Sequence, residues 1–177
     1  MGIHTCPRCS EPLHHGHPSC PVCNFSLSQI DSIFGSRRVR VERLVDASKT
    51  IAADEFDQLQ LRLQRFEQDF PQLFCAIYIA DLPEATNLRE LGFWLINRAI
   101  FDSQRSNDSA ILLCINNQTL SASLSLGYIP EQFLGEDALD STLNRAIPYL
   151  SDRQSGRLIA SCLNSLTWGL RRPGGVA

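Results

Sequence analysis

Four cysteines near the start of the chain fall into two C-x-x-C pairs, Cys6/Cys9 and Cys20/Cys23. Each pair can present two thiolates to the same side, so two facing pairs make a tetrahedral cage of four sulfurs. Zinc suits such a cage, because it accepts soft thiolates and imposes no geometry of its own. Since four thiolates leave no position open for water, the spacing predicts a structural zinc site rather than a catalytic one.

Two alternatives to zinc on four cysteines stay open. One of the nearby histidines could replace a thiolate: His4, His14, His15 or His17. The other is redox or disulfide chemistry, which the expected compartment argues against. The first residues contain neither the apolar segment nor the cleavage site of a secretory signal, and no stretch reaches the ~18 apolar residues of a membrane span. We therefore expect a cytoplasmic protein without a membrane span, where structural disulfides are rare.

Length and composition indicate one small module followed by one ordinary globular domain. The chain has 177 residues, of which 44% are hydrophobic and 20% charged, and this suits a single typical domain. We expect a zinc-ribbon-like module over residues 1–32, a linker over 33–38, an α/β domain over 39–172 and a tail over 173–177. A module of this size cannot bury enough apolar surface to fold alone. We therefore expect the metal to hold it together.

The larger domain alternates strand and helix patterns. Short apolar or alternating runs predict strands over residues 38–45, 73–80, 110–115 and 119–126. Helical spacing predicts helices over 56–70, 88–100, 136–147 and 152–171, the third ending near Pro148 and the fourth capped by Ser151. The order β-α-β-α-β-β-α-α predicts an α/β sandwich: a mostly parallel sheet with one antiparallel hairpin and helices on both faces.

The common enzyme signatures are absent from this domain. It contains no histidine, and therefore no Ser-His-Asp or Cys-His pair. Cys75, Cys114 and Cys162 lie in apolar segments and are interpreted as small buried hydrophobic residues. Neither glycine-rich phosphate-loop fingerprint is present. What remains is carboxylate chemistry, with or without a divalent cation.

Two polar clusters could carry that chemistry, at opposite edges of the predicted sheet. The carboxyl ends of the parallel strands, where α/β domains tend to bind ligands, should gather Asp46, Asp81, Asn116 and Asn117. The hairpin should bring together the loops that carry Asn107, Asp108, Glu131, Glu136 and Asp137. Either set offers oxygen ligands to Ca²⁺ or Mg²⁺. The alternative is that these side chains cap helices and stabilise turns.

Residues 39–170 resemble the TPM domain family, named for a thylakoid-lumen phosphatase, a photosystem repair protein and a membrane protein. The matching segments are VDASKTIAADEFDQL, CAIYIADL and SNDSAILLCINNQTLSASLSLGYIPEQFLGED. The resemblance implies an α/β sandwich, an acidic site for a divalent metal at Asn107, Asp108 and Glu131, and catalytic candidates Asp46 and Asp108. Some plant members are ascribed acid phosphatase activity. Ser109 and Ile129 replace family glycines, which leads us to expect weak or absent turnover.

Three functions follow as hypotheses. The first is a zinc-binding accessory protein whose TPM-like domain binds a protein partner or divalent cation in assembly or maintenance. The second is a metal-dependent acid phosphatase-like hydrolase. The third is nucleic-acid binding through the zinc module and a basic patch of Arg37, Arg38, Arg40 and Arg43. A net charge of −3 argues against the third.

Overall fold

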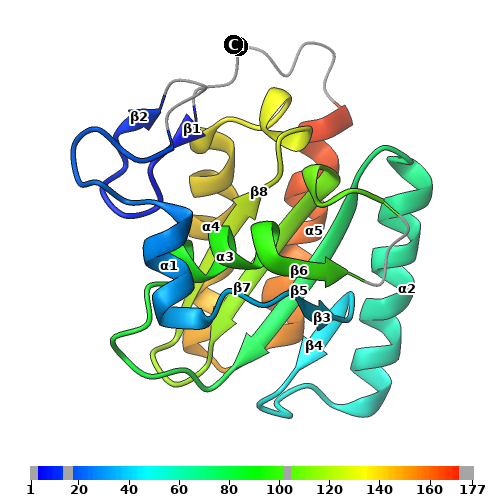
Figure 1. Cartoon of the computed structure of the whole chain (residues 1–177). Coiled ribbons are helices and arrows are strands. Elements are labelled where there is room, and N and C mark those ends of the chain that lie inside the picture. Colours follow the sequence, from blue (N-terminus) through cyan, green and yellow to red (C-terminus); the bar gives the residue numbers. More distant parts are fainter. Residues whose placement is uncertain (1–3, 14–17, 102–104, 172–177) are drawn as a thin grey trace.

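The computed structural model describes residues 4–13, 18–101 and 105–171. A four-stranded sheet in the order β4-β5-β7-β8 forms its centre, with β4 (Leu44–Asp46), β5 (Phe74–Ala80), β7 (Ala110–Asn116) and β8 (Ser121–Leu126). The first three strands are parallel, and β8 returns antiparallel to β7 (Figure 1). The predicted α/β fold, with a mostly parallel sheet and one hairpin, is confirmed.

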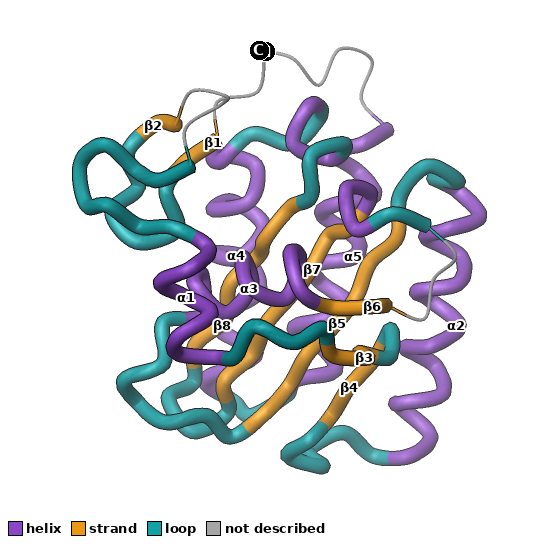
Figure 2. The backbone as a smooth tube through the Cα atoms, viewed as in Figure 1, coloured by secondary structure: helices purple, strands orange, loops and turns teal. Residues whose placement is uncertain are grey.

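Strands β5 and β7 are buried on both faces, because their side chains point alternately to two separate cores. Cys75, Ile77 and Ile79 of β5 face a core shared with α2 (Ala53–Asp69), α4 (Glu136–Ser151) and α5 (Ser155–Arg171). Phe74 and Ala76 face a second core shared with α3 (Leu88–Arg98). Helices therefore cover both faces of the sheet, as expected (Figure 2).

Two short segments form a second, two-stranded parallel sheet, β3 (Val39–Val41) with β6 (Ala99–Phe101). The predicted single strand over 38–45 is therefore wrong, because the chain turns between β3 and β4. The predicted helix end at Ile100 is also wrong, since α3 ends at Arg98. The Asn107 side-chain amide donates hydrogen bonds to the carbonyls of Ile96 and Ala99, at 2.8 and 2.7 Å, and this holds the extended exit from the helix.

The turn between α4 and α5 differs from the prediction. Helix α4 continues through Pro148 to Ser151, so Pro148 does not end it and Ser151 is not the cap of α5. The true turn is at Arg153, whose φ of 57° is left-handed. The Arg153 N–H donates to the Leu150 carbonyl at 2.9 Å, and the next N–H donates to the Tyr149 carbonyl at 2.8 Å. This is the Schellman pattern that closes helix C-termini, here made without the usual glycine.

The N-terminal residues pack against α3. They form a two-stranded antiparallel pair, β1 (His4–Thr5) with β2 (Pro12–Leu13), then α1 (Leu27–Phe34), which Ser26 caps. Phe25 and Ile30 join the second core beside Leu91, Trp94 and Leu95 of α3. The boundaries 1–32, 33–38 and 39–172 stay a prediction, and the tail 173–177 lies outside the described residues. Among the residues that the structure describes, no helix is both long and apolar enough to cross a membrane.

Candidate metal centre

The two C-x-x-C segments fold into turns with the same backbone pattern. In the first, the Cys6 N–H donates to the Glu11 carbonyl at 2.8 Å and the Ser10 N–H donates to the Cys6 carbonyl at 2.9 Å. The equivalent bonds in the second turn, residues 20–25, are 2.8 and 2.9 Å long. The residue after each second cysteine is left-handed, with φ of 60° at Ser10 and 57° at Asn24. Each turn thereby directs both of its thiols to one side.

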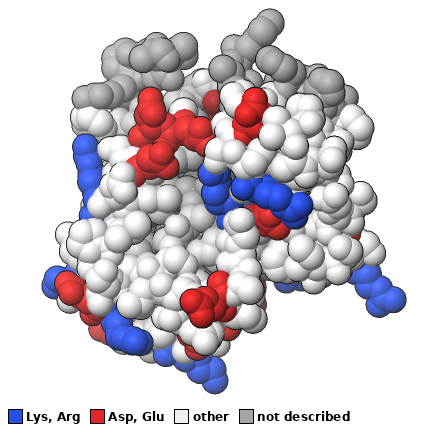
Figure 3. All heavy atoms as spheres, turned by 90° about the vertical axis from the view of Figure 1, so that its left-hand side faces the viewer, with Lys and Arg blue, Asp and Glu red and all other residues white. Residues whose placement is uncertain are grey.

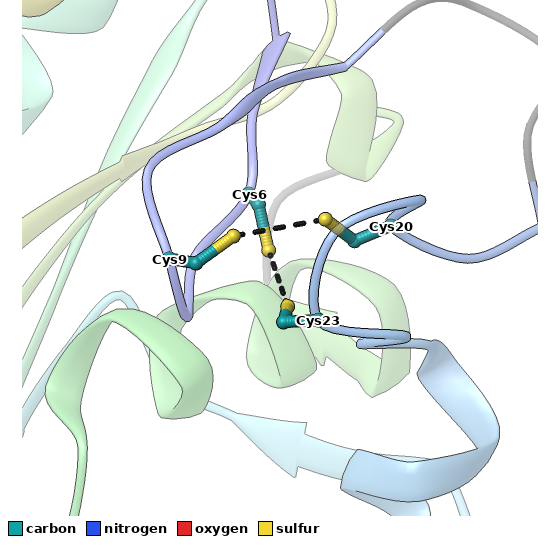
Figure 4. Close-up of side chains that lie close together, drawn as sticks. All are labelled: Cys6, Cys9, Cys20 and Cys23. Atoms are coloured by element: carbon teal, nitrogen blue, oxygen red, sulfur yellow. Dashed lines mark hydrogen bonds between the residues drawn. The ribbon is translucent and has the colours of Figure 1, made fainter.

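The four sulfurs converge between these turns (Figure 4). All four Sγ atoms lie within 4.8 Å of one another. Two of the separations join the two turns: 3.6 Å between the sulfurs of Cys6 and Cys23, and 3.7 Å between those of Cys9 and Cys20. A tetrahedron with Zn–S bonds of ~2.3 Å has edges of about 3.8 Å, whereas a disulfide needs about 2.05 Å. The cluster therefore fits a four-thiolate metal site.

Local hydrogen bonds prepare one of these thiols to ionise. A hydrogen bond from the Cys23 backbone N–H lowers the pKa of the Cys20 thiol to about 7, against the opposing effect of burial. Burial raises the pKa of the Cys6 thiol. Thiolates so close together repel one another, and a bound divalent cation both offsets that repulsion and favours the deprotonated ligands.

Arg8, between the first two cysteines, connects the metal centre to the rest of the molecule. Its guanidinium donates from Nε to Oε1 of Glu90 at 2.7 Å and from Nη2 to Oε2 at 3.3 Å. It also lies over the ring of Phe25, 5.0 Å from the ring centre. Glu90 belongs to α3 and is only 7% exposed. One side chain thus contacts both cysteine turns and the helix beneath them.

Further contacts fix α1 to the same helix. Arg98 forms an ion pair with Asp31, and the Trp94 indole N–H donates to the Gly35 carbonyl at 2.8 Å. A hydrogen bond from Arg98 lowers the pKa of the Asp31 carboxyl. Sequence reasoning missed this set of contacts, because each partner is separated from the other by 59 residues or more. Only the helical spacing of α3 hinted that one of its faces would be covered.

The structure says less about the other residues that the sequence singled out: the histidines, the basic patch and the remaining cysteines. His14, His15 and His17 lie outside the described residues, as does the side chain of His4, so replacement of a thiolate by histidine stays untested. In the basic patch, Arg43 Nε lies 2.9 Å from Oε1 of Glu67, which neutralises part of its charge. Arg37, Arg38 and Arg40 are exposed. The remaining cysteines are buried as expected, and burial raises the pKa of each: Cys75, Cys114 and Cys162.

Asp46 lies at the carboxyl end of β4, where its carboxylate organises a turn. It accepts hydrogen bonds from the Ser48 and Thr50 hydroxyls and, at 2.8 Å, from the Ile51 N–H. Asn117, after β7, donates to the same two hydroxyls. Two other residues of this edge have different surroundings: Asn116 bonds both the N–H and the carbonyl of Leu82, and Asp81 is exposed. These hydrogen bonds hold the turn after β4, and a catalytic role for Asp46 stays a prediction.

The loops of the opposite edge meet through their backbones. The Ile129 N–H donates to the Asp108 carbonyl at 2.8 Å. A side chain at Gly127 would lie 2.4 Å from the Asn107 carbonyl oxygen, so this close approach requires glycine. Ile129 has φ of −72°, so its replacement of a family glycine causes no left-handed strain.

The side chains of this edge differ in environment. Asp108 is exposed and accepts a hydrogen bond from Ser106, whereas burial raises the pKa of Glu131 to about 7. Among the described residues, the four cysteines are the one group of three or more histidine, cysteine or acidic side chains placed to share a metal ion. A Ca²⁺ or Mg²⁺ site at Asn107, Asp108 and Glu131 stays a prediction. Asp46 and Asp108 lie at opposite ends of parallel strands, so they do not share a site.

Comparison with known proteins identifies fold relatives. No family model and no curated protein matches the chain. The solution structure of the N-terminal domain of cg2496 from Corynebacterium glutamicum is similar, with a TM-score of 0.58 and 10% identity over 75% of this chain and 82% of that one. The N-terminal domain of a protein from P. gingivalis gives a TM-score of 0.52 and 14% identity, over 80% of this chain and 87% of that one. These likenesses show the fold.

Proposed function

We propose that this chain is a zinc-binding accessory protein, in which one Zn²⁺ on Cys6, Cys9, Cys20 and Cys23 holds the N-terminal module against α3. The observation that carries the proposal is the spacing of the sulfurs, 3.6 and 3.7 Å between turns, close to the edge of a zinc–thiolate tetrahedron. Four thiolates complete the coordination of zinc, so the ion is structural.

Elemental analysis of protein purified without added metal tests this role. We expect one zinc per chain, lost in Cys9→Ser and Cys23→Ser. Cys162→Ala is the matched control, because it removes a thiol that lies outside the site. A metal-free preparation in which residues 4–34 give the spectrum of a folded module would refute the proposal.

The larger domain, which resembles the TPM family, acts in this proposal by binding a protein partner or a divalent cation in assembly or maintenance. Two features support binding over catalysis. The residues from 39 onward contain no histidine, and the two catalytic candidates, Asp46 and Asp108, lie at opposite ends of the sheet. Amide spectra recorded during Ca²⁺ and Mg²⁺ titration test the cation part. Shifts at 107, 108 and 131 support the predicted site, and shifts at 46–51 and 116–117 place it at the other edge.

A metal-dependent phosphatase-like hydrolase is the second candidate, and Glu131 is the feature that favours it. Its pKa, which burial raises to about 7, suits a general acid or base near neutral pH. Hydrolysis of phosphomonoesters with and without Mg²⁺, Mn²⁺ or Ca²⁺ tests it. An activity that Glu131→Gln abolishes and the exposed-site control Glu84→Gln retains supports a hydrolase, and no turnover with any cation leaves the binding role. Nucleic-acid binding has less support, since Arg8 and Arg43 pair with carboxylates.

A further inference from the structure

The central sheet ends on one side in a strand without charge, proline or bulge. Strand β8 is the last in the order β4-β5-β7-β8 and pairs with β7 over six consecutive residues. Its sequence, SASLSL, contains no charge and no proline, and its register has no bulge. Charges, prolines and bulges are among the devices that block natural edge strands, because free edges pair with other chains. The opposite edge strand, β4, is only three residues long.

The alternation of hydrogen-bonded and non-hydrogen-bonded pairs in the hairpin shows which backbone N–H and carbonyl groups of β8 point outward. The Gly127 N–H donates to the Ala110 carbonyl at 2.8 Å, so Gly127 and Ala110 are a hydrogen-bonded pair. Such pairs alternate along an antiparallel ladder. In the register of this hairpin, the N–H and carbonyl groups of Ala122, Leu124 and Leu126 therefore point away from β7. No hydrogen-bond partner for these groups is found in the described part of the chain.

A side chain of the same strand is also unpaired. The Ser123 hydroxyl is buried without a hydrogen-bond partner among the described residues, and Ser123 as a whole is 6% exposed. Figure 3 shows the left-hand side of the molecule in Figure 1, where an uncharged area lies below a central group of Lys, Arg, Asp and Glu side chains. A neutral edge with outward backbone groups suits another extended, uncharged strand.

We propose that β8 pairs with β8 of a second copy, antiparallel and about a two-fold axis at Leu124. The outward residues then form hydrogen-bonded pairs: Leu124 with the partner's Leu124, and Ala122 with the partner's Leu126. The sequence is self-complementary about this point, because Ser123 and Ser125 flank Leu124. Ser123 lies opposite the partner's Ser125, where cross-strand hydroxyl bonds form in other sheets. Two four-stranded sheets become one of eight strands, through an isologous interface.

Light scattering and amide hydrogen exchange on the zinc-loaded full chain test this pairing. We expect a mass twice the 19.8 kDa of one chain. In the dimer, the outward amides of Leu124 and Leu126 should exchange as slowly as those of Ser123 and Ser125, which bond β7. Fast exchange at the outward amides overturns the proposal, whether the protein is a monomer or a dimer through another face. This measurement needs no variant.

A matched pair of variants at Ala122 gives a second test of the pairing. Ala122→Pro removes one outward N–H and leaves the bonds to β7 intact, so we expect the mass to fall to that of one chain. Ala122→Ser keeps the N–H and should remain a dimer. Circular dichroism establishes that both variants are folded. A folded Ala122→Pro variant that stays dimeric overturns the pairing. Zinc content should be unchanged throughout, so failure here is distinct from failure of the metal site.

Discussion

The guanidinium of Arg8 donates to the carboxylate of Glu90 at 2.7 Å and joins the zinc-ribbon-like module to a helix 82 positions along the chain. Glu90 lies at the start of α3, where the Asn87 side chain also caps the helix by accepting from two backbone N–H groups. The metal centre and the α/β domain therefore meet at a charged contact that lies over an apolar core.

The first prediction concerns this ion pair. Arg8→Ala leaves the buried Glu90 carboxylate without its cation, so we expect it to lower the free energy of unfolding by about 2 kcal/mol, below the range for a fully buried pair because Arg8 is 34% exposed. Urea unfolding measures the change. Glu90→Gln in the Arg8→Ala background should recover part of it, and Arg62→Ala on the exposed side of α2 is the control. If Arg8→Ala and Arg62→Ala lower the free energy of unfolding equally, the Arg8–Glu90 ion pair does not stabilise the protein.

The second prediction concerns removal of the metal. Chelation should abolish the native amide signals of residues 4–34 and keep most of the helical signal, because α2, α4 and α5 enclose a separate core on the other face of the sheet. The melting temperature should fall, since Leu91, Trp94 and Leu95 lose part of their covering. Circular dichroism and amide spectra report the two effects separately. Complete unfolding on chelation would show that the predicted boundary near residue 38 is wrong.

The third prediction is a pH dependence at Glu131. Its pKa is raised from 4.5 to about 7 in the folded protein, so the folded state holds this proton more tightly than the unfolded chain. Stability is therefore fully present below pH ~4.5 and falls as pH rises through ~7. Glu131→Gln should remove this fall and stabilise the protein at pH 8 by roughly 3 kcal/mol at most. Urea unfolding across this pH range measures the free energy of unfolding of wild type and Glu131→Gln. If the two values change with pH in the same way, the pKa of Glu131 is not raised.

The fourth prediction concerns Asp31, whose pKa the Arg98 hydrogen bond lowers. For a lowered carboxyl pKa, the stabilisation is present above the unfolded value of ~3.9 and is lost as pH falls through the folded value. The stability difference between wild type and Arg98→Gln should therefore be largest near neutral pH and disappear in acid. A difference that persists at pH 2 would assign the effect of Arg98 to packing instead.

The fifth prediction uses two glycines as a matched pair. A Cβ at Gly127 would lie 2.4 Å from the Asn107 carbonyl oxygen, so we expect Gly127→Ala to destabilise the protein by about 2 kcal/mol, as overpacking does. Gly135 has nothing within 4 Å of the same position, and Gly135→Ala should change stability far less. Thermal unfolding compares them, and similar melting temperatures would contradict the close approach of the two loops.

The parts of the fold that follow from the sequence are those with local, repeated signals. The apolar runs of β5 and β7 and the alternation of β8 predict three strands of the central sheet and its hairpin, and the C-x-x-C spacing places four sulfurs together. What could not be predicted depends on distant partners. Residues 99–101, which the pattern assigned in part to a helix, form a strand because they pair with Val39–Val41. Pro148 stays in α4 because it lies in the last turn, on the exposed side of the helix.

The candidate site also has a part that the sequence predicts and a part that depends on distant contacts. Cysteine spacing predicts a metal centre without any tertiary information, whereas the acidic candidates depended on which strand ends share an edge. Asp46 and Asp108 lie at opposite ends of the sheet, where the predicted strands had placed them. The contact between Arg8 and Glu90 has no local pattern at all, since an arginine between two cysteines looks like any exposed residue.

The packing of the cysteine turns on α3 also bears on how long the protein lasts. Without its metal, the module would uncover Trp94 and its neighbours, an apolar surface of the kind that proteases and chaperones engage. In the proposed role, chains that lack the metal would then be degraded ahead of those that hold it.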